Sequence, residues 1–105
     1  MVYRVVFATR AIQDLGDIVR FQARLSPTYA ERLGYSLFDE AISLTMLPNR
    51  GAAIPERPCY RRVFHPRWYL ILYHVNDPAQ IVTIVRIWDA RNDPKLLWHG
   101  EAHHP

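Results

Sequence analysis

The sequence has little cysteine, little lysine and no long hydrophobic run. Its single cysteine, Cys59, has no second cysteine to pair with, so no intrachain disulfide contributes to the fold. No apolar run approaches the length of a membrane span, and the opening stretch MVYRVVFATR lacks the long apolar core of a signal peptide. We therefore expect a soluble protein of the cytoplasm that has no membrane contact and needs no cofactor.

Arginine supplies almost all of the positive charge. Of the 13 basic residues, 12 are arginine and only Lys95 is lysine. Arginine matches phosphate and carboxylate geometry better than lysine does, which points to nucleic acid or an acidic partner. A codon preference for arginine explains the count equally well. Position is more informative, because Arg57, Arg61, Arg62 and Arg67 fall within eleven residues that contain no Asp or Glu.

The first half of the chain predicts one strand followed by two helices. Residues 2–7 (VYRVVF) are β-branched and aromatic, which favours a strand. Apolar residues then recur at three- and four-residue steps over residues 9–25, with Asp14 near the positive end of the helix dipole. A Ser-Pro start and a leucine-rich stripe predict a second helix over residues 26–47. So short a turn between two helices predicts an antiparallel hairpin.

The second half predicts a three-stranded antiparallel meander between Tyr60 and Arg91, after a loop over residues 48–58 with room for one short extended piece. Alternation in its second strand separates two faces. One face has Tyr69, Ile71, Tyr73 and Val75, and the other has Trp68, Leu70, Leu72 and His74. In the last strand the uncharged set is the better candidate for the core beneath the helices: Ile81, Thr83, Val85 and Ile87. Arg86 and Trp88 then lie on a second apolar surface that needs a partner or a folded-back tail.

The predicted fold is a single α+β domain over residues 1–98. Its element order is β-α-α-β-β-β, with the helical hairpin packed on one face of an antiparallel sheet. Residues 99–105 are predicted to form a flexible tail. That tail has a metal-like composition without a fixed spacing, so we assign no metal site to it: His99, Glu101, His103 and His104.

Several motifs together resemble the RelE/ParE family of bacterial toxins. The first half has A-x-x-D-L-x-x-I from Ala11, S-P-x-x-A from Ser26 and L-P-x-x-G from Leu47. The second half has R-x-Y-L-I-x-Y-x-V from Arg67, and I-V-x-I-V-R-I-W-D-A-R ends at Arg91. Their order and spacing agree over nearly the whole chain. The resemblance implies the toxin of a type II toxin-antitoxin pair, with a cognate antitoxin as its partner.

Family members that resemble RelE cut messenger RNA on the ribosome, which requires acid-base groups and cations around the scissile phosphate. The resemblance places two of the cations at Arg61 and Arg91. A further arginine of the family nucleases falls on Leu70, and their C-terminal tyrosine falls near Leu97. A RelE-like endoribonuclease acting on ribosome and mRNA is therefore the alternative interpretation, with a rearranged site made of Arg61, His65 and Arg91.

The ParE-like branch fits the chain better. Its members are described as inhibitors of DNA gyrase that act by protein contact, and they share the two helix motifs. We therefore predict a ParE-like toxin without an assigned catalytic residue. Its predicted target-binding residues are Arg61, Arg62, Arg67, Arg86 and Arg91. The positions expected to be exposed for the antitoxin are Leu70, Leu72 and Trp88. Any contact with DNA is expected to pass through the antitoxin.

Overall fold

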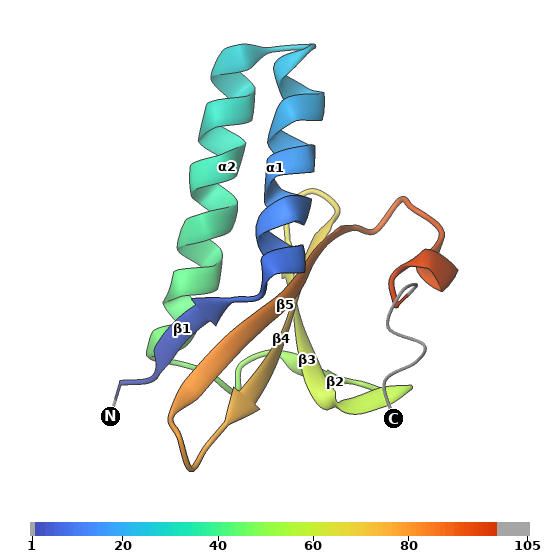
Figure 1. Cartoon of the computed structure of the whole chain (residues 1–105). Coiled ribbons are helices and arrows are strands. Elements are labelled where there is room, and N and C mark those ends of the chain that lie inside the picture. Colours follow the sequence, from blue (N-terminus) through green and yellow to red (C-terminus); the bar gives the residue numbers. More distant parts are fainter. Residues whose placement is uncertain (1, 99–105) are drawn as a thin grey trace.

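A computed structural model describes residues 2–98, so the predicted tail at 99–105 lies outside the described residues. Two helices lie on one side of a mixed sheet, and the C-terminal segment curls back on the other side (Figure 1). The elements are β1 (Arg4–Phe7), α1 (Thr9–Ala23), α2 (Pro27–Ile42), the 3-10 turn η1 (Ser43–Thr45), β2 (Ala52–Ile54), β3 (Arg57–His65), β4 (Tyr69–Asn76), β5 (Ile81–Asp89) and the 3-10 turn η2 (Pro94–Leu96). The strand order is β1-β5-β4-β3-β2. The predicted α+β class with a helical hairpin is confirmed.

The helices begin and end close to the predicted places. The Ser26 hydroxyl accepts a hydrogen bond from the Tyr29 backbone N–H at 3.3 Å, and a proline follows the cap, as the Ser-Pro start predicted. The second helix is shorter than predicted, because η1 replaces its last turn. Helix α1 has no acidic residue in its first turn. Asp14 lies deeper in the helix and faces the sheet, so its predicted dipole role is wrong.

The sheet differs from the predicted antiparallel sheet in two respects. Strand β1 pairs with β5 in parallel, with Val5 opposite Val82. A parallel pair needs a long connection, which the helical hairpin and the meander supply. The loop between the helices and the meander contains one more strand, β2, which pairs antiparallel with β3 so that Ala53 lies opposite Arg61.

A β-bulge in β5 changes which side chains face the helices. Leu72 pairs with Arg86 while the next residue, Tyr73, pairs with Ile84, so Val85 is an extra residue. Val82 and Ile84 therefore pack in the helix-side core, and only Ile87 of the predicted set does so. The prediction is wrong for Ile81, Thr83 and Val85, because an extra residue reverses a period of two. Strand β4 has the predicted faces for Tyr69, Ile71, Tyr73 and Val75 against Leu70 and Leu72.

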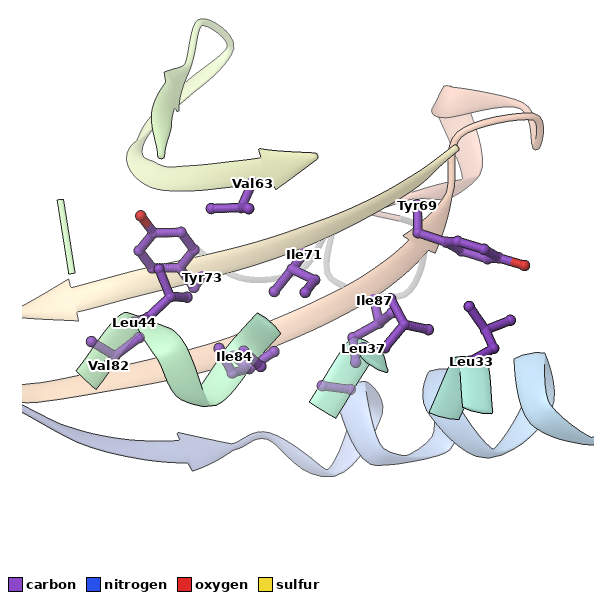
Figure 2. Close-up of a cluster of buried hydrophobic side chains, with 12 residues drawn as sticks. Leu33, Leu37, Leu44, Val63, Tyr69, Ile71, Tyr73, Val82, Ile84 and Ile87 are labelled. Atoms are coloured by element: carbon purple, nitrogen blue, oxygen red, sulfur yellow. The ribbon is translucent and has the colours of Figure 1, made fainter. Parts of the chain in front are cut away.

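The helix-side core is the larger of two apolar clusters. Figure 2 shows Leu37 beside Ile87 and Leu44 beside Tyr73 on the helix side of the sheet. Each fully buried Leu or Ile contributes roughly 1.5–3 kcal/mol of transfer free energy. The core therefore fixes the hairpin on this face of the sheet, and the loops at the ends of the strands are positioned by it.

The far-side cluster covers the other face of the sheet. Its buried members are Ile54, Leu72, Trp88 and Leu97. The chain after β5 brings Leu97 back onto the sheet, which is the folded-back tail that the sequence offered as one possibility (Figure 1). The expected exposure of Leu72 and Trp88 is wrong, since they are only 1% and 9% exposed beneath this segment.

Candidate functional site

The guanidinium groups of Arg67 and Arg91 both lie near the ring of Trp68, at one end of the sheet. The guanidinium carbon of Arg91 lies 4.0 Å from the centroid of the Trp68 ring, and that of Arg67 lies 6.0 Å from it. Trp68 stands in the turn before β4, and Arg91 follows β5 by two residues. A cation over an indole face is attracted by the ring quadrupole. We call Arg67, Trp68 and Arg91 the arginine–tryptophan site.

Asp89 orients the Arg91 side chain. Its carboxylate accepts hydrogen bonds from Arg91 Nε at 3.0 Å and from Nη2 at 2.6 Å, and the Arg91 backbone N–H donates to it at 2.9 Å. Partial burial acts to raise the pKa of Asp89, but the hydrogen bonds from Arg91 outweigh it and the pKa is lowered. The same contact raises the pKa of Arg91. Both groups are therefore charged at neutral pH, and Arg91 remains largely exposed.

A cavity of about 460 Å³ opens beside Arg91. The Tyr69 hydroxyl and the Gln22 side chain meet there at 3.4 Å. The cavity is lined by the end of α1 and the ends of β4 and β5: Asp17, Ile18, Phe21, Gln22, Tyr69, Asp89, Arg91 and Asn92. Sequence reasoning singled out Arg91 but missed Gln22, because a polar residue near a helix end gives no signal of what it meets across the fold.

Arg61 and Arg62 point to opposite faces of β3. Arg61 is half-buried and its Nη1 donates to the Gly51 carbonyl at 2.6 Å, so this guanidinium ties the preceding loop to the sheet. A Cβ at Gly51 would lie 2.6 Å from both the Arg62 carbonyl and the Tyr73 hydroxyl, which is why glycine is needed there. Arg62 is exposed and makes no side-chain hydrogen bond within residues 2–98. Of this pair, Arg62 is the more accessible cation.

Arg86 is a buried structural residue, so its predicted exposure to a target is wrong. It is 2% exposed, and its Nε and Nη2 donate to the Asp14 carboxylate at 2.7 and 3.0 Å. Its Nη1 also donates to the Leu97 carbonyl. Arg86 lies opposite Leu72 on the far side of the sheet and reaches α1, where Asp14 supplies the charge that a buried guanidinium needs. Asp14 belongs to the A-x-x-D-L-x-x-I motif, but the sequence alone did not identify its partner.

Arg61 lies apart from the other two residues of the alternative nuclease site. Arg61 precedes His65 by four residues in β3, roughly 13 Å along a strand, and it contacts the loop at Gly51. His65 is hydrogen-bonded to Ser36 and Glu40 of α2, both at 2.8 Å. Arg91 lines a cavity that contains neither of the other two. Sequence reasoning missed Ser36 and Glu40, which lie one helical turn apart and could be paired with His65 only through the fold.

The family model for the ParE toxin of the type II toxin-antitoxin system parDE matches residues 5–94. This chain belongs to the ParE toxin family. It is a type II toxin of the wider RelE/ParE group. A search of curated protein sequences finds no match to the chain.

Solved structures of toxin-antitoxin systems resemble the toxin. A chromosomal ParDE system from Pseudomonas aeruginosa has a TM-score of 0.71 at 24% identity, covering 82% of this chain and 94% of that one. The RelBE2 toxin-antitoxin complex from Mycobacterium tuberculosis has a TM-score of 0.63 at 26% identity, covering 83% and 96%. A mutant of Escherichia coli RelE in the free state has a TM-score of 0.58 at 20% identity, covering 86% and 85%. The likenesses at 24% and 20% identity show a shared fold.

The toxin has more exposed large apolar side chains on the helical hairpin than on the sheet, where Val6 and Phe64 are exposed. Ile12, Tyr35, Phe38 and Ile42 are exposed on the hairpin. A shallow groove between the helices is lined by Leu15, Val19, Ala30, Glu31, Gly34, Tyr35 and Phe38. Of the three residues predicted for the antitoxin, Leu70 is half-buried and borders the far-side cluster. The amphipathic pattern predicted the inner face of each helix but gave no reason to expect so apolar an outer face.

Two further findings apply to residues 2–98 of the toxin. None of its helices there is long and apolar enough to cross a membrane. The same residues contain no group of three His, Cys, Asp or Glu side chains placed to hold a metal ion. The histidines of the tail, which have a metal-like composition, lie outside the described residues.

Proposed function

We propose that this toxin inhibits DNA gyrase by protein contact and is neutralised by a cognate antitoxin. The observation that carries the proposal is the separation of Arg61 from His65 and Arg91, which lie at the other end of the strands. Cleavage of RNA needs acid-base groups and cations within hydrogen-bond reach of one phosphate. Arg61 is held at Gly51, four residues along β3 from His65, so the three groups do not converge in this way, whereas a contact surface needs no such convergence.

Two leucines strengthen this choice over the RNase alternative. The resemblance to RelE-like nucleases requires an arginine at Leu70 and a tyrosine near Leu97. Leu70 lies opposite Trp88 and borders the far-side cluster, and Leu97 is a buried member of it. Both positions therefore contribute to apolar packing. An uncompensated charge placed among these side chains would be costly.

The arginine–tryptophan site is the surface that we assign to the target. Arginine and tryptophan are the residues that most often dominate the energy of protein interfaces. Asp89 holds the Arg91 guanidinium against Trp68, so little side-chain freedom is lost when a partner binds. Arg67 adds a second positive charge, which suits an acidic surface on the target, and Arg62 is a further exposed cation on β3.

The antitoxin is assigned to the outer face of the hairpin, with Leu70 at the sheet as a second contact. The M. tuberculosis relative is described as a toxin-antitoxin complex, which supports such a partner. A groove flanked by Tyr35 and Phe38 suits the apolar side of a helix or an extended segment. Contact through Leu72 and Trp88 would first require displacement of the segment around Leu97.

Two assays run side by side test the proposed target. Purified toxin is added to DNA gyrase with relaxed plasmid, and the supercoiled product is measured. The same preparation is added to a translating extract, and mRNA cleavage is mapped. We expect supercoiling to be inhibited while mRNA stays intact, and added antitoxin to restore supercoiling. Strong ribosome-dependent cleavage with gyrase unaffected would replace the proposal by the RelE-like alternative. A gyrase target also places the toxin in the cytoplasm.

A further inference from the structure

Ser36, His65 and Glu40 form a linear hydrogen-bonded chain outside the arginine–tryptophan site. Ser36 and Glu40 lie four residues apart on α2, and His65 ends β3. His65 Nε2 is 2.8 Å from Ser36 Oγ, and His65 Nδ1 is 2.8 Å from Glu40 Oε1. One ring nitrogen thus faces a hydroxyl and the other faces a carboxylate. That is the order of groups that activates a serine in hydrolases.

Glu40 selects the tautomer of His65 that this chemistry requires. An ionised carboxylate only accepts hydrogen bonds, so the proton of the neutral imidazole lies on Nδ1 and Nε2 is left as an acceptor for the Ser36 O–H. Partial burial acts to raise the pKa of Glu40, but hydrogen bonds from His65 and Arg50 outweigh it and lower the pKa. Arg50 donates to Glu40 Oε2, which fixes the carboxylate from its other side, and the same nitrogen donates to Ser43 Oγ at 2.8 Å.

Ser43 shows that Ser36 differs from an ordinary helix serine. The Ser43 hydroxyl donates to the Glu40 backbone carbonyl at 2.6 Å, so its proton is held by the helix. The Ser36 hydroxyl is instead hydrogen-bonded to His65 Nε2. Both serines are exposed and line the same cavity of about 520 Å³. They therefore form a matched pair that differs in the hydrogen-bond partner of the hydroxyl.

The surroundings of Ser36 leave room for a small substrate. Arg32, one turn earlier on α2, lines this cavity and a neighbouring one together with Ser36 and His65. Its guanidinium forms no ion pair within residues 2–98. A cation beside the attacked carbon is suited to stabilise the negative charge that develops on a carbonyl oxygen.

We propose that Ser36 is an activated nucleophile that accepts an acyl group from small activated carboxylic esters. Ser36 Oγ bonds to the carbonyl carbon while its proton passes to His65 Nε2. The bond from that carbon to the leaving oxygen then breaks, and His65 returns the proton to the departing alcohol or phenol. Ser36 and His65 are the catalytic residues, and Glu40 is a positioning residue. This activity is independent of the proposed gyrase target.

The full chain with p-nitrophenyl acetate as probe tests the proposal. We expect release of nitrophenol with one acetyl group on Ser36, located by peptide mass spectrometry. Ser36→Ala should abolish this acetylation, and it should fold, because alanine is favoured at an exposed helix position. His65→Gln should slow it about 100-fold, the contribution of a positioned general base. Ser43→Ala should still be acetylated at Ser36.

Glu40→Gln tests the positioning role through a readout other than rate. In wild-type protein the Nδ1 proton of His65 should give a downfield proton resonance, which should move upfield in Glu40→Gln. A wild-type chain that is not acetylated at Ser36 overturns the proposal. So does equal acetylation of Ser36 and Ser43, or an undiminished rate at Ser36 in folded His65→Gln. Circular dichroism establishes that each variant is folded.

Discussion

Strand β5 and the residues after it contain two arginines that each pair with an aspartate in similar geometry but in different surroundings. Arg86 donates to Asp14 at 2.7 and 3.0 Å, and Arg91 donates to Asp89 at 3.0 and 2.6 Å through the same two nitrogens. The side chains of the first pair are 3% and 11% exposed. Those of the second pair are 49% and 17% exposed. Burial, rather than hydrogen-bond geometry, separates them.

Burial gives the two pairs different roles. The Arg86 guanidinium joins α1 to β5 and to the Leu97 carbonyl, so three parts of the chain depend on it. Removing one member of a buried pair leaves a charge without compensation. The Arg91 guanidinium is oriented by Asp89 but still reaches solvent, where exposed pairs contribute little to folding. The first pair therefore holds the fold together, and the second is available to a target.

The largest effect on stability is expected from Arg86→Ala. The substitution leaves the buried Asp14 carboxylate with only a long contact to the exposed Arg10, 3.8 Å away, and should lower the free energy of unfolding by about 3–5 kcal/mol. Urea denaturation followed by circular dichroism measures this loss. Arg86→Met combined with Asp14→Asn is the control, because the asparagine oxygen can still accept from the Ile87 N–H that now donates to Asp14 at 3.0 Å. The double variant should recover most of the stability; if it does not, charge compensation is not the reason for the loss.

A smaller loss of stability is expected at the segment that covers Arg86. Leu97 is 9% exposed and packs in the far-side cluster, whereas its neighbour Leu96 is 51% exposed. Leu97→Ala should lower the free energy of unfolding by about 2 kcal/mol, near the lower end for a buried leucine. Leu96→Ala is the matched control and should change little. Equal effects of the two substitutions, measured by thermal denaturation, would mean that the segment is not packed on the sheet as described.

The difference between Arg86 and Arg91 also shows what could be predicted from the sequence. Periodicity was sufficient for both helices and for the faces of β4, since a side chain's direction follows from local spacing there. It failed in β5, where Val85 is an extra residue and reverses the alternation before it. Arg86 kept the predicted face, opposite Leu72, but the pattern could not show that it is buried there, because it pairs with a residue 72 positions earlier in the chain.

The candidate site could be predicted only for residues that belong to a family motif. Arg91 was identified from the family resemblance, but its stacking on Trp68 depends on a turn and a strand end that only the fold brings together. The Ser36–His65 contact likewise joins residues 29 positions apart. Contacts between residues so far apart cannot be detected from the spacing of residues in the sequence. Each partner appears there as an ordinary polar residue of its own helix, strand or loop.

For Arg91→Ala the expected effect lies in target binding and not in folding. Its side chain is largely exposed, so thermal denaturation should match that of the wild type. Loss of an interface arginine should weaken binding to the target on the order of 30-fold. Supercoiling inhibition and growth inhibition in cells without antitoxin measure this effect. Arg4→Ala, an exposed arginine at the start of β1, is the control and should remain toxic. Undiminished growth inhibition by Arg91→Ala would remove Arg91 from the target surface.

The smallest expected effect is the contribution of Asp89 to the pH dependence of stability. Because the pKa of Asp89 is lowered in the folded state from its usual 3.8, its pairing with Arg91 stabilises the fold above that value. This contribution is lost as the pH falls through the lower, folded-state pKa. The difference in stability between wild type and Asp89→Asn should therefore be small and constant from pH 7 to about pH 5 and shrink below pH 4. Urea titrations across this range measure it. A difference that instead grows in acid would show that Asp89 is not stabilised as a carboxylate by Arg91.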